Sequence, residues 1–337
     1  MQIRGISINT DGSYLNGSVD RLASCLEHAE RLGFDGIELS LHGLDLIVGG
    51  KTHPRQLDRV RRVLEGTELT LSAHAPDRLN LAFPQRIPGC EPELQLEQDV
   101  FAACLEVCQA LGIQVMVYHS GLIGLHEARL GLQPLPDEEA LERGRAQEVA
   151  ALRELMPVAE QCGVTVAMEN RDPHPWEVAV LAQAEISHKE LPRYHAGMLV
   201  PALVRQVEEV GHPLFGLTLD LGHLYLAANY CRFDYLQAIR QAAPQVRHIH
   251  GSDNFGRLGG VFDEMHFRIP YGDGDVHMPH GWGNLPHAEA LAQLLGDEGL
   301  HEALYQALYV MEIRPRFRDH LGDALAFLRE TIAQVSG

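Results

Sequence analysis

Residues 138–170, EEALERGRAQEVAALRELMPVAEQCGVTVAMEN, decide the fold. Apolar residues recur at helical spacing as far as residue 162, and Gly163 then separates this segment from the short apolar run VTVAME at 164–169. A helix-length segment followed by a β-branched run is typical of folds in which helices alternate with parallel strands. The strand ends in two polar residues, Glu169 and Asn170.

The same alternation extends in both directions along the chain. We predict strands at 3–9, 36–40, 69–75, 114–119, 164–169, 215–220, 246–250 and 308–313. Helices are predicted at 19–32, 54–65, 94–111, 138–162, 201–210, 233–243, 286–295 and 319–332. Eight such pairs predict an α/β fold, a single (β/α)8 TIM barrel that occupies residues 1–337 as one domain. An open doubly wound sheet is the alternative, but GISINTDGSYLNG at the first strand contains no GxGxxG phosphate loop.

Three of the connections that follow strands are long, at 120–136, 171–199 and 251–285. In a barrel they lie on the C-terminal face, where long loops usually serve a site. We therefore expect elongated loops around a site at that face.

The bulk composition limits the partners and the location. The 337 residues carry a formal net charge of −19, which disfavours nucleic acid because that affinity comes mainly from Lys and Arg. The chain shows neither a leader-like N-terminus nor an apolar run of about 18 residues, so we expect no membrane partner. Six cysteines without a CxxC pair are typical of reduced thiols in a cytoplasmic protein. Only Lys51 and Lys189 are lysines, and neither ends a strand, which disfavours a Schiff-base mechanism.

Carboxylates and imidazoles stand where the apolar strands end, or in the loops and turns directly beyond, and in a barrel these ends converge on one mouth. They are His74, His119, Glu169, Asp220, His223, His248, His250, Asp253, Asp275, His277, His280 and Glu312. Imidazole nitrogen with carboxylate oxygen suits zinc, manganese, iron or cobalt. A single histidine at such a place is more often structural, but four ligand-type residues on four strand ends, Glu169, Asp220, His250 and Glu312, predict a divalent metal site. We interpret Asn170 and His248 as supporting or structural groups, and His42, His53, His188, His195 and His301 as surface or loop residues.

These motifs resemble the xylose-isomerase-like barrel superfamily, which groups sugar isomerases and epimerases with endonuclease IV. The similarity spans nearly the whole chain, through HAP and LNLA at 74–82, MEN at 168–170, DLGH at 220–223, HIHGSDN at 248–254 and DVH at 275–277 followed by GWGN at 281–284. In the isomerases and epimerases one divalent metal is bound by a set that corresponds here to Glu169, Asp220, His250 and Glu312. The resemblance also implies substrate contacts by His223 and by Arg257.

The chain also resembles endonuclease IV, whose three zinc ions are bound by nine residues. All nine positions match, which adds His74, His119, His223, Asp275 and His277 as further ligands and implies one to three ions. The DLGH and DVH segments also occur in sugar isomerases. The identity of the ligands therefore does not distinguish isomerisation from phosphoester hydrolysis. Against DNA repair, Asp77 stands where that family has an aromatic residue, GISIN replaces its N-terminal G-x-H-x-S motif, and an Arg-rich DNA-binding loop is not evident.

The leading hypothesis is a metal-dependent sugar or sugar-phosphate isomerase or epimerase that acts on a small polyhydroxylated substrate. One of Glu169 and Glu312 removes a proton next to a carbonyl to give an enediolate, and the other serves the opposite face in an epimerase. Trp176 and Trp282 either wall a sugar ring or pack loops onto the barrel. The alternatives are a multinuclear zinc phosphoesterase and a barrel that only binds a sugar or metal. Dimers and tetramers are common in the isomerase branch, so a homo-oligomer is compatible with the resemblance.

Overall fold

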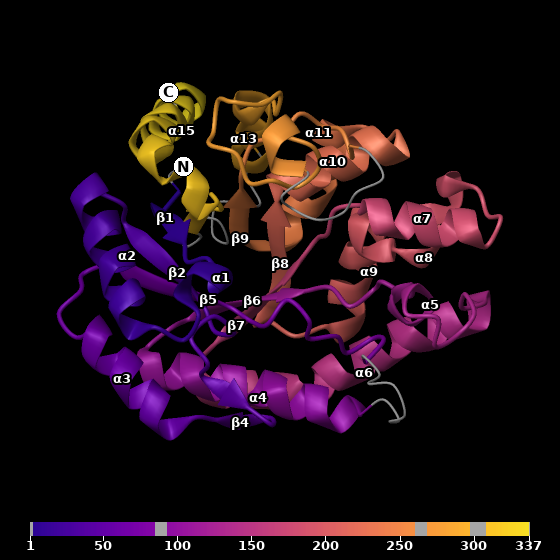
Figure 1. Ribbon diagram of the computed structural model, residues 1–337, viewed down its shortest axis with the longest axis horizontal. Helices are drawn as coiled ribbons and strands as arrows, with labels where there is room; N and C mark the ends of the chain where they lie inside the picture. The colour runs from indigo at the N-terminus through magenta and orange to yellow at the C-terminus, as the bar shows by residue number, and fades with distance from the viewer. Residues whose placement is uncertain (1–2, 85–92, 260–267, 297–307, 337) are drawn as a thin grey trace.

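The computed structural model describes residues 3–84, 93–259, 268–296 and 308–336, so Cys90 and His301 lie outside the described residues. Eight parallel strands close into a barrel in the order β1-β10-β9-β8-β7-β6-β5-β2, with helices around it (Figure 1). The strands are β1 Gly5–Asn9, β2 Gly36–Ser40, β5 Thr70–His74, β6 Val115–His119, β7 Thr165–Glu169, β8 Phe215–Asp220, β9 Val246–Gly251 and β10 Leu308–Met311. The prediction of a (β/α)8 TIM barrel is confirmed.

The outer layer contains the predicted helices, with ends that differ by a few residues. They are α2 Val19–Leu32, α3 Pro54–Leu64, α4 Leu94–Leu111, α6 Glu138–Cys162, α9 Val200–Val210, α11 Tyr235–Ala242, α13 His287–Leu295 and α15 Leu321–Ser336. Gly163 ends α6 with a φ of 67°, a left-handed conformation that turns the chain directly into β7. Because β7 then runs through the barrel, Glu169 at its end lies at the opposite end of the barrel from Gly163.

Short helices occupy connections for which the sequence pattern predicted none. They are α1 Gly12–Leu15, α5 His126–Arg129, α7 Pro175–Gln183, α8 Leu191–Tyr194 and α10 Leu221–Cys231, with 3₁₀ turns η1 His188–Glu190, η2 Ala196–Met198, η3 Ala243–Gln245, η4 Ile269–Tyr271 and η6 Pro315–His320. A two-stranded hairpin, β3 Ile47–Val48 and β4 Lys51–Thr52, lies against α4. The long connection 171–199 is thus largely helical. Helix α10 escaped prediction because most of its residues are apolar and buried, which leaves no amphipathic period.

The interface between the strands and the surrounding helices forms the main hydrophobic core, whereas polar side chains such as Glu38, Ser72 and His248 are buried within the barrel. Ile37, Leu39, Met116, Val166 and Leu217 are among its buried strand residues. Within the described ranges, none of the helices is both long and apolar enough to cross a membrane.

Replacing Gly251 with alanine is expected to lower the free energy of unfolding by about 2 kcal/mol or more, because the new methyl group would overlap the buried phenol of Tyr309. Gly322→Ala is the matched control. Its methyl group would come no closer than 3.8 Å to Leu32, and Ala is preferred over Gly within a helix. Chemical denaturation of both variants tests this, and equal midpoints would contradict it.

Candidate metal centre

Four buried ligand-type side chains meet at the C-terminal mouth of the barrel. Glu169, Asp220 and His250 come from the ends of β7, β8 and β9, and Glu312 directly follows β10. Each residue offers an oxygen or nitrogen atom, and these four atoms all lie within 4.8 Å of one another. The four strands are consecutive neighbours in the barrel, which explains how residues far apart in sequence converge.

Two further groups of donor residues adjoin this set. His74 and His119, at the ends of β5 and β6, place their Nε2 atoms 3.2 and 3.1 Å from Oε2 of Glu169. His223, in the first turn of α10, and His277 lie 3.6 and 2.5 Å from Oδ2 of Asp275, again through Nε2. The structure therefore brings together all nine residues that the sequence analysis named as ligands.

Three of these histidines are anchored in the same way. The Nδ1 atoms of His74, His223 and His277 lie 2.7, 2.9 and 3.2 Å from backbone carbonyl oxygens, those of Ala75, Asn170 and Glu312. Each ring thus turns its Nε2 toward a carboxylate. Because a ring nitrogen that donates to a carbonyl fixes the tautomer, the opposite nitrogen is left with a lone pair for a cation.

His277 also has a strained backbone. Its φ is 49°, in the left-handed region that residues other than glycine rarely adopt. Such a conformation costs on the order of 1–3 kcal/mol and persists where the surrounding structure enforces it, often at functional sites.

Asp220 serves both a strand and a helix. Its Oδ1 accepts a hydrogen bond from the backbone N–H of His223 and so caps α10, while its Oδ2 is buried without a hydrogen-bond partner among the described residues. Asn170 holds the backbone of Asp220 from both sides, donating to its carbonyl and accepting from its N–H. The second oxygen of Asp220 is therefore held in place and left free for a ligand.

Burial and neighbouring charges shift the pKa values of the site in opposite directions. Burial, with the nearby carboxylates Glu169 and Asp220, raises the pKa of Glu312 to about 7. Burial likewise raises the pKa of Asp220. Burial by itself would lower the pKa of His250, but Glu38 and Glu169 raise it well above its ordinary value.

The residues present fit a divalent cation. They supply both imidazole nitrogen and carboxylate oxygen, the donor chemistry of zinc and its neighbours. Buried carboxylates without a partner are costly, and a cation would satisfy the orphaned oxygen of Asp220. Glu169, Asp220, His250 and Glu312 form a donor group of four, and every member is buried.

Metal affinity is expected to rise with pH. In the metal-free protein the pKa values of His250 and His223 lie well above the ordinary value and that of His74 is about 10, because carboxylates adjoin all three rings against the effect of burial. These imidazoles hold protons at neutral pH, and a metal must displace them. Titration of apo-protein with Zn²⁺ from about pH 6 to 8 should show about tenfold tighter binding per pH unit for each proton released. A pH-independent Kd would contradict this.

A cavity of about 300 Å³ opens above the donor residues. Among its walls are His74, His119, His223, Asp275, His277 and Glu312, whereas Glu169 is not. Arg171 and Arg314 also line it and supply positive charge. Arg171 is oriented by donating from Nε to the carbonyl of Ser120 at 2.7 Å. The cavity is of a size and polarity that suit a small polar ligand.

Three residues predicted to contact substrate lie elsewhere. Arg257 pairs with Asp273 at 2.6 Å and lines a separate surface groove. Trp176 packs behind the cavity against His174 and under the guanidinium of Arg129. Trp282 is half exposed and packs against Phe317 and His320. None of the three lines the cavity, although other residues of the same loops do, among them His174, Asp275 and His277.

Sequence reasoning missed Glu38 and did not indicate that His195, which does lie in a loop, is buried. Glu38 on β2 is buried and lies 3.0 Å from both His248 and His250. The signal was available, since a glutamate interrupts the apolar strand GIELS. His195 was interpreted as a surface or loop residue, yet it is fully buried in its loop, 2.9 Å from the buried Glu177. A carboxylate partner distant in sequence gave no local signal.

A closed parallel barrel with histidines and carboxylates at its C-terminal mouth defines a class of proteins. The family model described as xylose isomerase-like TIM barrel matches residues 26–331, and the chain belongs to this family. An uncharacterized protein of Mycobacterium tuberculosis is 28% identical over 281 residues, which cover 82% of this chain and 80% of that protein.

Solved structures share the fold at low sequence identity. A D-tagatose 3-epimerase-like protein aligns with a TM-score of 0.66 and 18% identity over 98% of both chains. The IolI protein, solved with a bound zinc atom, aligns with a TM-score of 0.61 and 18% identity over 98% of this chain and 97% of that one.

Proposed function

We propose that this protein is a metal-dependent isomerase or epimerase of a small sugar or sugar phosphate. The observation that carries the proposal is the buried set Glu169, Asp220, His250 and Glu312 beneath a polar cavity of about 300 Å³, with Glu312 alone of the four in its wall. The family and its epimerase-like neighbours agree with this class of reaction.

The four residues would hold a divalent ion of zinc, manganese, cobalt or iron. When bound, such an ion polarises a carbonyl and makes the neighbouring C–H more acidic. His74, His119 and His250 surround Glu169 and fix its carboxylate below the cavity floor. The remaining cavity wall then determines how the substrate lies.

Glu312 is placed to move the proton. Its carboxylate lines the cavity, so it is within reach of a substrate bound there, as a general base must be. Abstraction from a carbon beside the carbonyl gives an enediolate, and return of the proton to the neighbouring carbon gives isomerisation. In epimerisation the proton returns to the opposite face of the same carbon. The sequence analysis gave this role to the second glutamate, Glu169, which does not line the cavity and would act only on a substrate that reaches the metal set below the floor.

His223, Arg171 and Arg314 would orient the substrate. All three line the cavity, and a guanidinium binds hydroxyl oxygens or a phosphate by paired hydrogen bonds. We therefore assign to Arg171 and Arg314 the substrate contact that the sequence analysis gave to Arg257.

The five described cysteines are free thiols, in keeping with the predicted cytoplasmic location.

The proposal is tested with the metal-loaded protein and a panel of ketoses and ketose phosphates in deuterated water. We expect at least one of them to incorporate deuterium next to its carbonyl. Absence of exchange across the panel, with metal bound, would overturn the proposed reaction.

A second candidate, phosphoester hydrolysis, is favoured by one specific observation. The donor groups His74–His119–Glu169 and His223–Asp275–His277 flank the central set, so two further ions could be held. Three adjacent zinc ions activate water for attack on phosphorus. Metal analysis separates the candidates, because about one ion per chain favours the isomerase and about three favour the hydrolase. Hydrolysis of a phosphoester by the three-metal form would establish the alternative.

A further inference from the structure

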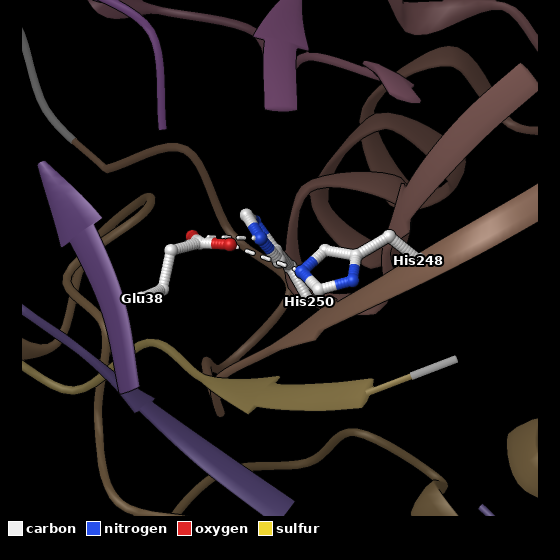
Figure 2. A group of neighbouring side chains, drawn as sticks. All are labelled: Glu38, His248 and His250. Carbon is white, nitrogen blue, oxygen red and sulfur yellow. Dashed lines mark hydrogen bonds and ion pairs between the residues drawn. The ribbon is translucent and has the colours of Figure 1, made fainter. Parts of the chain in front are cut away.

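Glu38 lies inside the barrel, far in sequence from the residues that it contacts. It comes from β2, which is separated from β9 by β1 and β10, and it reaches His248 and His250 across the interior. Figure 2 shows its two oxygens directed at the two imidazoles. Oε2 lies 3.0 Å from Nε2 of His248, and Oε1 lies 3.0 Å from Nε2 of His250.

His250 is oriented differently from three other histidines of the centre. In His74, His223 and His277 a backbone carbonyl holds Nδ1 and Nε2 faces the donor group. In His250 it is Nδ1 that faces Glu169, at 3.0 Å, and Glu312, at 3.4 Å. Its Nε2 lies 3.0 Å from Oε1 of Glu38, so this ring has a carboxylate in ion-pair contact where the other rings have a hydrogen bond to a carbonyl.

Glu38 is itself held in place. The hydroxyl of Ser72 donates to its Oε2 at 2.9 Å, and Nε2 of His248 contacts the same oxygen. All of these residues are buried, and Glu38 also lines the cavity of about 300 Å³. The carboxylate is left with Oε1 directed at His250.

We propose that Glu38 is a positioning residue that fixes His250 as an Nδ1 ligand and strengthens its binding of the metal. This inference rests on the metal site of the proposed function. A carboxylate that accepts from the outer N–H of a ligating histidine fixes the ring and makes its other nitrogen more basic, and loss of such a partner typically costs 10–100-fold in metal affinity. His248 keeps Glu38 aligned with His250.

The experiment is titration of apo-protein with Zn²⁺ in competition with a chromophoric chelator. Glu38→Gln keeps the shape but loses the charge, and its amide must present N–H to one of two imidazole N–H groups. We expect Kd for Zn²⁺ to rise about 10–100-fold. Glu38→Asp keeps the charge and should recover part of the affinity.

Glu177→Gln is the matched control. Glu177 is a fully buried glutamate 2.9 Å from a buried histidine, His195, but lies outside the donor groups. Its substitution should lower thermal stability and leave Kd for Zn²⁺ unchanged. The visible spectrum of the Co²⁺-loaded protein should change in Glu38→Gln and stay as in the wild type in Glu177→Gln.

Each outcome bears on the inference. Wild-type affinity and an unchanged Co²⁺ spectrum in Glu38→Gln would overturn it, as would an equal loss of affinity in Glu177→Gln, which would indicate a general effect of packing. Wild-type protein that binds no metal would instead overturn the proposed function. If Glu38→Gln binds Zn²⁺ more weakly than the wild type but no sugar of the panel exchanges, the proposed reaction fails and the positioning role of Glu38 stands.

Discussion

Replacing Glu312 with glutamine is expected to slow C–H exchange of the substrate by about 10²–10⁴-fold, the usual contribution of a general base. Glutamine keeps an oxygen that can face the metal but has no group that accepts the substrate proton. Because Glu312 lines the cavity, the loss should fall mainly on kcat. Deuterium incorporation followed by NMR measures it.

The matched comparison is Glu169→Gln. Glu169 lies beneath the cavity floor, within reach of three histidines, so its substitution should lower metal content as well as rate. Metal analysis of both variants separates the two roles. Full exchange in Glu312→Gln that has normal metal content would show that another group moves the proton.

Removal of the metal with a chelator is expected to lower exchange by about 10³-fold, since polarisation of a carbonyl by a cation is worth several kcal/mol. The melting temperature should fall as well, because an ion that binds only the folded chain stabilises it, by about 2.7 kcal/mol at 100 times its Kd. In the metal-free site burial holds the pKa values of Asp220 and Glu312 above their ordinary range. A cation would favour the ionised form of both carboxyl groups.

Restoring the metal provides the control for chelation. Addition of Zn²⁺, Mn²⁺ or Co²⁺ to the chelated protein should return both the exchange rate and the melting temperature. A chelated sample that is free of metal by analysis and still exchanges at the original rate would contradict the proposed chemistry.

The sequence by itself determined the barrel and the placing of carboxylates and imidazoles at the ends of its strands. Hydrophobic periodicity is a local property, so the strand that ends in Glu169 and the helix before it can be located without knowledge of the rest. Once eight such units close into a ring, their strand ends must meet, and the donor residues that stand at those ends must meet as well. Asp275 and His277 lie far along the loop after β9, so barrel closure alone does not bring them there.

Only the tertiary structure decided which loop residues reach the cavity. Arg257, Trp176 and Trp282 follow strands as the donors do, yet they turn to Asp273, Arg129 and Phe317. The path of a long loop depends on what it packs against, which no local period encodes. Glu38 was hidden for a related reason: its partners on β9 lie across the barrel interior, and contacts between strands that are not neighbours leave no pattern along the chain.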